Sequence, residues 1–374
     1  MTIFKRIIEE KIRENLFKNR AILIFGPRQA GKTTLAKRLL EPFGNEGSYF
    51  SCEIASVRKY FEVGKPELLK ELVENKKVVV FDEAQTIENI GAILKVFIDA
   101  YPGVQIIATG SSSFDLANRI NEPLTGRSLE YLLLPLSLEE LRIAQGTIVK
   151  NDLLELLRLG SYPAVVAEPG TSTKESILSN LATNYLYKDV FIFESIKNPT
   201  VFENLVKLLG LQIGSLVSVN ELSQTLGVSR ATIEKYIRLL EQSYVIKRVY
   251  GFSRNPRTEI KKAFKVYFLD VGIRNAVIDN TALIEQRSDK GALLENFVYS
   301  ELLKKYSGEA FSPQLHFWRT RTGAEIDFVT EHNGIINAYE CKWTLESVSF
   351  RDFLKKYTDA KTHTVNIESL IQGI

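Results

Sequence analysis

The sequence contains little cysteine. Only 2 of its 374 residues are cysteines, Cys52 and Cys341, and they lie far apart in the chain. Their separation matches no metal-ligand or disulfide spacing, which excludes a cysteine-held metal centre and a disulfide framework. We predict that both are ordinary thiols of a reducing compartment, with Cys341 on a strand.

Long apolar runs and a strong net charge are also absent. No segment approaches the roughly 18 apolar residues that a membrane-spanning helix requires, and residues 1–6 lack the apolar core of a signal peptide. Lysine and arginine number 48 against 45 acidic residues, so the net charge of +3 neither requires nor excludes a polyanionic partner. We therefore predict a soluble, cytoplasmic protein without a membrane partner.

The order of apolar patterns along the chain predicts more than one domain. Strand-like runs at 21–25, 77–81 and 104–109 alternate with helix-like stretches as far as residue 135, which indicates a parallel sheet with helices on both faces. Residues 1–20 are predicted to form one amphipathic helix, and 137–213 is mainly helical. The elements expected near the C-terminus are a helix at 292–306, strands at 316–319, 325–330 and 335–343, a helix at 350–360 and a strand at 363–367.

A phosphate-binding loop follows the first strand. The match to G-x-x-x-x-G-K-[ST] is complete and lies between a buried strand and a helix, where its mechanism requires it. Backbone N–H groups of such a loop surround the phosphates of ATP, the lysine reaches the β- and γ-phosphates, and the hydroxyl after it ligates Mg²⁺. The residues concerned are Gly26, Pro27, Arg28, Gln29, Ala30, Gly31, Lys32, Thr33 and Thr34.

An acidic pair follows the second strand. Asp82 and Glu83 come directly after Val78–Phe81, at the carboxyl end of a strand where open parallel sheets bind their ligands. Asp82 is expected to hold the magnesium ion through water, and Glu83 to orient or deprotonate the attacking water. The pair favours ATP hydrolysis over binding alone.

Two further residues are candidates for this site. Ser111 follows the third strand, and its hydroxyl either contacts the γ-phosphate or water or only caps a helix. Arg127 precedes a strand at 129–134 and is a candidate arginine finger for a neighbouring subunit, with Arg119 as its competitor. A plain surface arginine is the alternative for Arg127.

At this point the sequence resembles the AAA+ superfamily, and in particular a prokaryotic family that joins an AAA+ core to a winged helix and a nuclease-like C-terminal domain. The resemblance implies an ATP-binding core with a helical lid, and self-association into a ring or another oligomer. The segments that carry it are residues 26–35, 81–85, 109–112, 124–127, 160–163 and 267–272.

Residues 218–233 have a helix-turn-helix layout. Ser218 and Ser229 are predicted to cap two helices around a turn at Gly227, and a strand-like run at 244–250 follows as a wing would. Arg230, Thr232 and Lys235 would point outward from the second helix toward DNA. The basic residues that follow are Lys247, Arg248, Arg254, Arg257, Lys261, Lys262 and Lys265, against one acid, Glu259. Salt-dependent DNA binding is the preferred interpretation, and a lid or protein-contact module is the alternative.

The C-terminal segment looks like the PD-(D/E)XK nuclease fold. Strand alternation places Glu325 with Asp327 on one face, and likewise Glu340 with Lys342 on the next strand. Asp327 and Glu340 are predicted to share a divalent metal while Lys342 orients or activates water, with Glu295 as an accessory ligand. The departure from the family pattern is Ile326, which stands where a proline often precedes the acidic residue. A degenerate domain that only holds DNA or neighbouring subunits is the alternative.

Together these patterns predict an α/β protein of four parts. They are a P-loop AAA+-type parallel-sheet core at 1–136, a helical lid at 137–213, a winged helix at 214–280 and a restriction-endonuclease-like α/β domain at 281–374. The predicted function is an ATPase that uses Mg²⁺ and acts on DNA, including branched or foreign DNA, with potential nuclease activity. The alternative is an ATP-dependent assembly or regulatory switch whose later domains bind protein.

Overall fold

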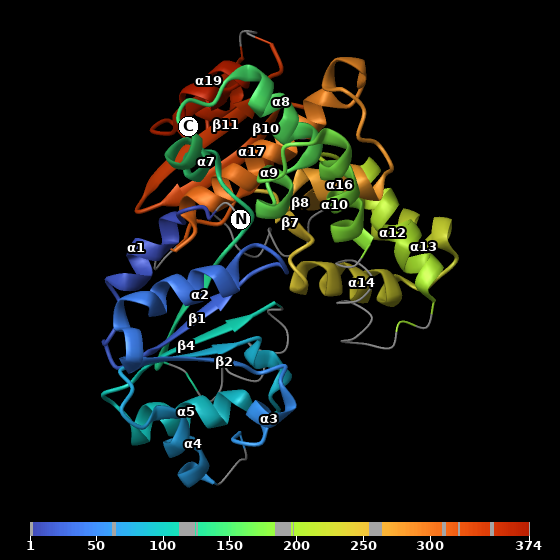
Figure 1. Ribbon diagram of the computed structural model, residues 1–374. Helices are drawn as coiled ribbons and strands as arrows, with labels where there is room; N and C mark the ends of the chain where they lie inside the picture. Colours follow the sequence, from blue (N-terminus) through green and yellow to red (C-terminus); the bar gives the residue numbers. More distant parts are fainter. Residues whose placement is uncertain are drawn as a thin grey trace. The chain divides into compact units, whose positions relative to one another are not determined.

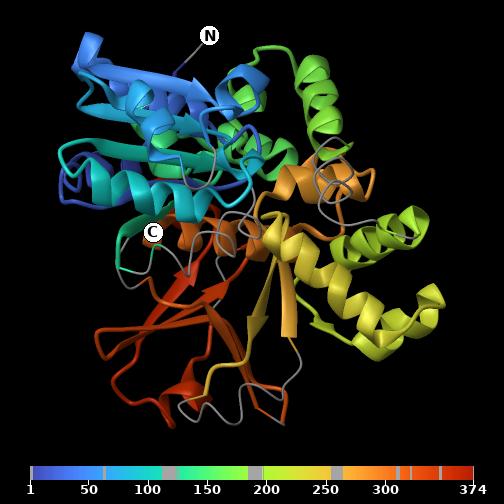
Figure 2. The same ribbon diagram turned by 90° about the horizontal axis from the view of Figure 1, so that it is seen from below.

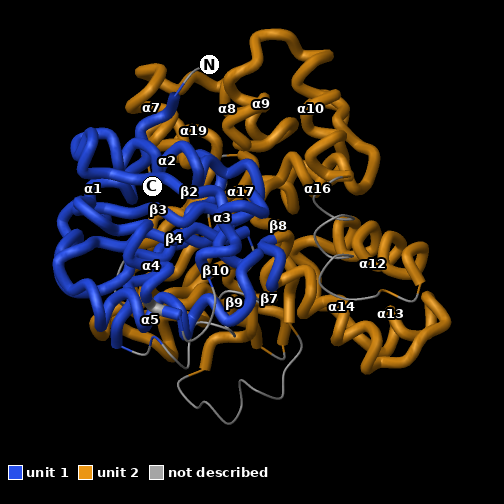
Figure 3. The backbone as a smooth tube through the Cα atoms, turned by 60° about the horizontal axis from the view of Figure 1, so that its bottom comes forward, with its two compact units in different colours: residues 1–136, 242–244 blue, residues 137–241, 245–374 orange. Residues whose placement is uncertain are grey.

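The computed structural model describes residues 3–61, 65–111, 124, 126–183, 196, 198–253, 264–308, 312–320, 322–344 and 348–373. The chain divides into two compact units (Figure 3), one of residues 1–136 with 242–244 and one of residues 137–241 with 245–374. Across these described ranges, no helix has both the length and the apolar character that crossing a membrane would demand.

The first unit is built on a five-stranded sheet. Its strands are β1 (Ala21–Phe25), β2 (Gly47–Ser51), β3 (Val78–Asp82), β4 (Gln105–Gly110) and β5 (Ser128–Leu132). They lie in the order β2-β3-β4-β1-β5 and every neighbouring pair is parallel, so the predicted parallel α/β core is confirmed. Every residue of β1, β3 and β4 is buried, as expected for strands covered on both faces.

Helices cover both faces of this sheet (Figure 1). On one face, α1 (Ile7–Arg13) and α2 (Lys32–Leu40) bury their apolar sides against β1 and β3. On the other, α4 (Pro66–Val73) and α5 (Ile90–Ala100) pack through a cluster centred on Phe81 and Phe97. Short elements complete the unit: η1 (Glu41–Glu46), α3 (Ala55–Arg58) and η2 (Ala84–Thr86).

The prediction of one helix over residues 1–20 is wrong. Helix α1 ends at Arg13, and Phe17 and Asn19 adopt left-handed backbone conformations with φ of 60° and 54°. The backbone N–H of Phe17 donates to Oε1 of Gln105 at 2.6 Å, and its ring packs on Phe43. These long-range contacts turn the chain into β1, and helical periodicity alone does not reveal them.

The second unit begins with helices and a small sheet that share one core. Its elements are α7 (Leu138–Gln145), α8 (Lys150–Leu159), α9 (Pro163–Val166), α10 (Thr171–Thr183), α12 (Pro199–Leu211), β6 (Leu216–Val217), α13 (Val219–Leu226), α14 (Arg230–Gln242), β7 (Ile246–Tyr250), β8 (Phe264–Phe268), α16 (Val271–Val277) and η4 (Ile284–Gln286). The strands pair antiparallel in the order β6-β8-β7. A single buried cluster extends from Leu159 to Val277 and joins the elements from the end of α8 to α16, whereas α7 and η4 contribute no residue to it.

The chain ends in a helix and a four-stranded sheet. The elements are α17 (Lys290–Tyr306), β9 (His316–Arg319), β10 (Glu325–His332), β11 (Ile335–Cys341), α18 (Arg351–Leu354), β12 (Lys361–Val365) and α19 (Ile367–Gln372). The sheet order is β12-β11-β10-β9, with β11 and β12 parallel and the other pairs antiparallel. Figure 2 shows these strands beside β7 and β8. The helix predicted at 350–360 is shorter, because only Arg351–Leu354 is helical before the chain turns toward β12.

Two motifs that carry the family resemblance meet in the core of the second unit. Asp270 caps α16 by accepting from the N–H of Ile273 at 3.1 Å, and it also accepts from the N–H of Ser161 at 2.8 Å. A Cβ at Gly272 would lie 2.2 Å from the carbonyl oxygen of Leu159, so only glycine fits there. The two motifs are therefore explained by packing.

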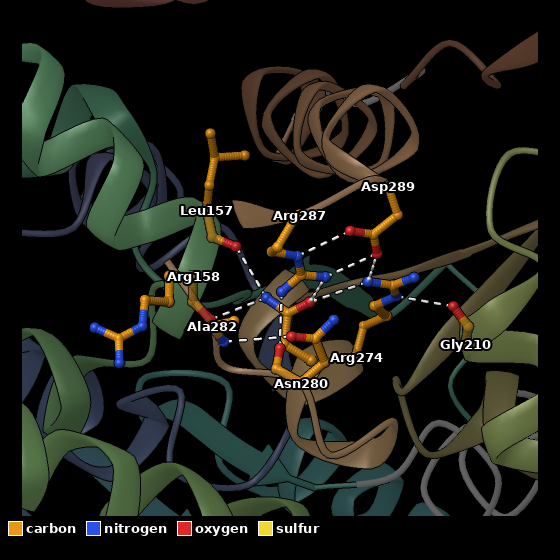
Figure 4. A network of polar contacts seen from close by, with 9 residues as sticks. Leu157, Arg158, Gly210, Arg274, Asn280, Ala282, Arg287 and Asp289 are labelled. Carbon is orange, nitrogen blue, oxygen red and sulfur yellow. Dashed lines mark hydrogen bonds and ion pairs between the residues drawn. The ribbon is translucent and has the colours of Figure 1, made fainter. Parts of the chain in front are cut away.

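Two buried arginines, Arg274 and Arg287, lie in the same region and share the carboxylate of Asp289 (Figure 4). Arg274 donates to Asp289 at 2.6 Å and to the carbonyl of Gly210 at 2.8 Å, while Arg287 donates to Asp289 at 2.8 Å. Burial alone would raise the pKa of Asp289, but the hydrogen bonds from Arg287 and Arg274 lower it to about 2. Asp289, just before α17, therefore holds Arg274 of α16, and Arg274 in turn reaches the carbonyl of Gly210 on α12.

Candidate functional site

The phosphate-binding loop is shaped by glycines that no other residue could replace. Gly26 has a φ of 148°, and a Cβ there would lie only 2.0 Å from the carbonyl oxygen of Leu133. Gly31, at the N-cap of α2, has a φ of 102°. Gln29 between them is also left-handed, with a φ of 59°. The loop thus curls from the end of β1 into the first turn of α2, where N–H groups without helical partners can face an anion.

Lys32 lies inside this loop. The residue is only 3% exposed, and its side-chain ammonium donates to the carbonyl oxygens of Gly26 at 3.0 Å and Pro27 at 2.9 Å. An ammonium held by loop carbonyls can exchange them for phosphate oxygens without leaving the loop.

The carboxylate of Asp82 is surrounded by hydroxyl groups. Its Oδ2 accepts from Thr33 at 2.8 Å and from Tyr49 at 2.6 Å, and its Oδ1 accepts from Thr109 at 2.5 Å. Burial, followed by the hydrogen bond to Asp82, raises the pKa of the Tyr49 phenol, so that this group remains a neutral donor. The structure therefore brings Thr33 and Asp82 together from two motifs. Tyr49 and Thr109 escape sequence reasoning, since only the register of β2, β3 and β4 places them here.

Glu83 is oriented by its neighbours. Its backbone is left-handed, with a φ of 52°, and its N–H donates to the hydroxyl of Thr109 at 3.0 Å. Its carboxylate accepts from the side-chain amide of Gln85, which also donates to Ser111 at 3.0 Å. Ser111 thus belongs to the hydrogen-bonded network of the acidic pair, whereas Ser112 and Ser113 lie outside the described residues.

Arg6 braces the loop from outside. It is 6% exposed and donates to the carbonyl oxygen of Ala30 at 2.6 Å and to that of Leu134 at 2.5 Å. A loop whose N–H groups face inward must turn carbonyls outward, and a buried carbonyl needs a donor. No sequence motif identifies Arg6, because the residue stands before the first strand and far from the loop in sequence.

Arg127 lies away from these groups. Its carbonyl accepts from the N–H of Ala21, the first residue of β1, whereas the phosphate loop follows the last residue of that strand. Its guanidinium pairs with Asp99 at 2.8 Å on the surface. Arg127 is therefore not part of the Lys32–Asp82 group within the same unit. Its competitor Arg119 lies outside the described residues.

A second group of polar residues lies in the C-terminal part. Asp327 accepts from the N–H of Cys341 at 2.7 Å, and Oε1 of Glu340 pairs with Lys342 at 3.0 Å. The other oxygen of Glu340, Oε2, is buried without a hydrogen-bond partner. Burial, and then the charge of Glu340, raises the pKa of Asp327 to about 6. Burial, and then the charge of Asp327, raises the pKa of Glu295 to about 7.

Lys265 enters the same group, which corrects the prediction that it contacts phosphates. It is 2% exposed, and its ammonium lies 2.6 Å from Glu325 and 3.1 Å from Glu295. Burial lowers the pKa of Lys265, but these carboxylates outweigh burial and the net shift is upward. Among the residues that the structure describes, no three histidine, cysteine, aspartate or glutamate side chains are grouped so as to hold a metal ion.

The predicted DNA-binding residues fall into three groups: exposed, paired with glutamates, and outside the described residues. Arg230 and Lys235 are exposed on α14, with the N–H of Thr232 donating to the predicted cap Ser229 at 3.1 Å. Arg248 is not available to phosphates as predicted, because it pairs with Glu234 at 2.9 Å and with Glu241 at 2.7 Å. The remaining predicted contacts, Arg254, Arg257, Lys261 and Lys262, lie outside the described residues.

Family models match three segments of the chain. Residues 18–142 match a model described as an AAA domain, and residues 150–283 and 290–371 match two domains of unknown function, DUF8612 and DUF4143. The first segment contains the phosphate loop, Asp82 and Glu83. Residues 18–142 are therefore similar to AAA domains and contain a complete phosphate-binding loop.

Relatives that match most of this chain occur in archaea and bacteria. An uncharacterised protein of Methanocaldococcus jannaschii is 26% identical, over 97% of this chain and 84% of its own length. An uncharacterised protein of Mycobacterium tuberculosis is 26% identical, over 92% of this chain and 75% of its own.

Solved structures with a related arrangement are more distant. AMPPCP-bound DnaA of Aquifex aeolicus matches 63% of this chain and 86% of its own at 14% identity, with a TM-score of 0.30. A signal transduction ATPase with numerous domains from Pyrococcus horikoshii matches 81% of this chain and 45% of its own at 11% identity, with a TM-score of 0.32.

Proposed function

We propose that this protein hydrolyses Mg·ATP in its first unit and couples the reaction to DNA held by its second. The observation that carries the proposal is the meeting of Thr33, Asp82 and Glu83 beside Lys32 at one end of the sheet. Thr33 would ligate Mg²⁺ and Asp82 would hold it through water, which suits a hydroxyl and a carboxylate oxygen 2.8 Å apart. When bound, the ion supplies positive charge to the β- and γ-phosphates.

The chain's own groups divide the remaining work. The loop N–H groups and the ammonium of Lys32 bind the phosphates, and Lys32 gives up the carbonyls of Gly26 and Pro27 to do so. Glu83 accepts a proton from the attacking water or orients it, while Gln85 and the Thr109 hydroxyl set its position. A switch that only binds nucleotide has less need of such a carboxylate.

DNA is the proposed partner because of the helix-turn-helix arrangement of α13 and α14 and the β7–β8 hairpin that follows. Exposed Arg230 and Lys235 lie on α14, which would be the recognition helix of a winged helix. Four further basic residues, Arg254, Arg257, Lys261 and Lys262, lie in the connection between the two strands of the hairpin. Such a concentration of positive charge would bind the DNA backbone.

ATP turnover with no DNA, single-stranded DNA, duplex DNA and a four-way junction tests the proposal. We expect one DNA form to stimulate turnover in the wild type. Lys32→Ala and Glu83→Gln should abolish this turnover, whereas Glu88→Gln, an exposed glutamate five residues away from Glu83, should not. Turnover that is equal under all four conditions would remove DNA from the proposal and favour a protein partner. ATP binding without any turnover would favour the nucleotide switch.

A second candidate activity is metal-dependent cleavage of DNA by the C-terminal part. The observation that favours it is the orphaned Oε2 of Glu340, since a buried carboxylate oxygen without a donor suits a metal ion. Asp327 and Glu340 would hold the ion, and Lys342 would orient or activate water. Cleavage of branched and linear DNA with Mg²⁺ or Mn²⁺, lost in Asp327→Ala, is the expected result. An absence of cleavage in every combination would reduce the domain to a binding module.

A further inference from the structure

Lys265 reaches the carboxylate group of the C-terminal part from a different sheet. It lies on β8, whose backbone is held on both sides, with Cα partners Leu216 on β6 and Val249 on β7. Tyr267, two residues further on, donates to Oε1 of Glu295 at 2.5 Å and stacks on Tyr299. Because alternate residues of a strand share a face, β8 directs both side chains to the same helix residue. The position of the ammonium is thus determined by the strand and not by a flexible loop.

Two lysines contact three of the four carboxylates, and the fourth, Asp327, accepts from the N–H of Cys341 at 2.7 Å. Lys265 contacts Glu295 and Glu325, and its ammonium also lies 5.5 Å from the ring of Phe317. Lys342 contacts Oε1 of Glu340, whose Oε2 has no partner. Carboxylates that are partly withdrawn from water require a cation or a proton, and Glu295 with Glu325 is compensated differently from Asp327 with Glu340. The pair around Lys265 already has its cation.

We propose that the ammonium of Lys265 takes the place of a metal ion between Glu295 and Glu325. The four carboxylates therefore bind only one divalent ion, which Asp327 and Glu340 hold. The proposal rests on the metal site of the second candidate activity and deepens it. It removes Glu295 from the ligands and gives it a different role, that of holding Lys265. It also explains how Glu295 and Glu325 stay close to each other before any ion binds.

Mn²⁺ binding to the full chain measures this directly. The experiment uses an Asp82→Asn background without nucleotide, so that the ATP site contributes no ion, and reads the number of bound ions by calorimetry and by the electron paramagnetic resonance of Mn²⁺. The parent should bind one ion and lose it in Asp327→Asn. Lys265→Met should bind a second ion, because Glu295 and Glu325 then lose their shared ammonium and Glu325 keeps only the more distant Arg319, at 3.7 Å. Lys247→Met, an exposed lysine on the neighbouring strand β7, is the matched control and should leave the number at one.

The outcomes separate the inference from the function on which it rests. Two ions in the parent, or one ion at unchanged affinity in Lys265→Met, would overturn the role of Lys265 while leaving the metal site intact. No ion in the parent would refute the metal site itself. If Lys265→Met does not fold, Glu295→Gln decides: the single ion remains if Glu295 only holds Lys265, and its loss would make Glu295 a ligand and overturn the proposal.

Discussion

Replacing Arg6 by alanine would remove the brace of the phosphate loop without touching any group that contacts ATP. Two charge-assisted hydrogen bonds, to the carbonyls of Ala30 and Leu134, would be lost, and both carbonyls are on buried residues. A hydrogen bond to a charged group contributes about 1.5–3 kcal/mol, and a buried acceptor left without a donor costs about 1–3 kcal/mol. We therefore expect the free energy of unfolding of the first unit to fall by about 3 kcal/mol.

Part of this loss should appear in nucleotide binding, because the loop then samples conformations in which its N–H groups no longer converge. A penalty of about 1.4 kcal/mol on the binding-competent loop would weaken ATP affinity about tenfold. Arg6→Lys, which can donate to one of the two carbonyls, should recover part of both effects. The assays are urea unfolding and titration with a fluorescent ATP analogue, with turnover measured at saturating ATP.

Lys5→Ala is the matched control, since Lys5 is exposed and pairs with Glu10 on the surface. It should leave both the stability and the ATP affinity close to those of the wild type, because solvent screens an exposed pair. An Arg6→Ala protein that is destabilised but binds ATP as the wild type does would refute the role of Arg6 in the loop and leave it a purely structural one.

Three further expectations follow from particular contacts. Although burial opposes it, hydrogen bonds from Arg287 and Arg274 lower the pKa of Asp289 to about 2. Because an unfolded aspartate titrates near about 3.9, this stabilisation is complete above that pH and is lost as the pH falls toward 2. The stabilities of the wild type and Asp289→Asn, measured by denaturant, should therefore converge over that interval, and a constant difference would contradict the assignment. If Arg127 acts as an arginine finger on a neighbouring subunit, Arg127→Ala should lower ATP turnover about 10³-fold at unchanged ATP affinity. If Arg127 is only a surface residue, turnover should not change, and loss of the ion pair with Asp99 should lower the free energy of unfolding by at most about 1 kcal/mol. The double variant Arg230→Ala/Lys235→Ala should reduce the slope of log affinity for DNA against log salt by about 2, whereas Lys207→Ala on α12 should not change it.

Local sequence patterns were sufficient to predict the core of the first unit. The strands around β1, β3 and β4 are continuous apolar runs, because strands covered on both faces need no polar side. The phosphate loop and the Asp82–Glu83 pair are short contiguous motifs placed at strand ends. Parallel strands then bring these ends together, so that Thr33 and Asp82 meet although 49 positions separate them. For such features, neighbouring residues carry enough information.

Other features of the fold and of the sites depend on contacts between segments that are distant in the sequence. Tyr49, Arg6 and Gln85 act through partners that no spacing rule connects to them, and α1 ends early because Phe17 binds Gln105. Lys265 is the clearest case, since a lysine in a basic stretch suggests a surface for phosphates. A charge pattern describes only the residues along the strand, whereas a buried ammonium is stabilised by the carboxylates that tertiary structure places around it. Glu295 and Glu325, from a helix and a strand that come later in the chain, convert Lys265 from a surface cation into an internal one.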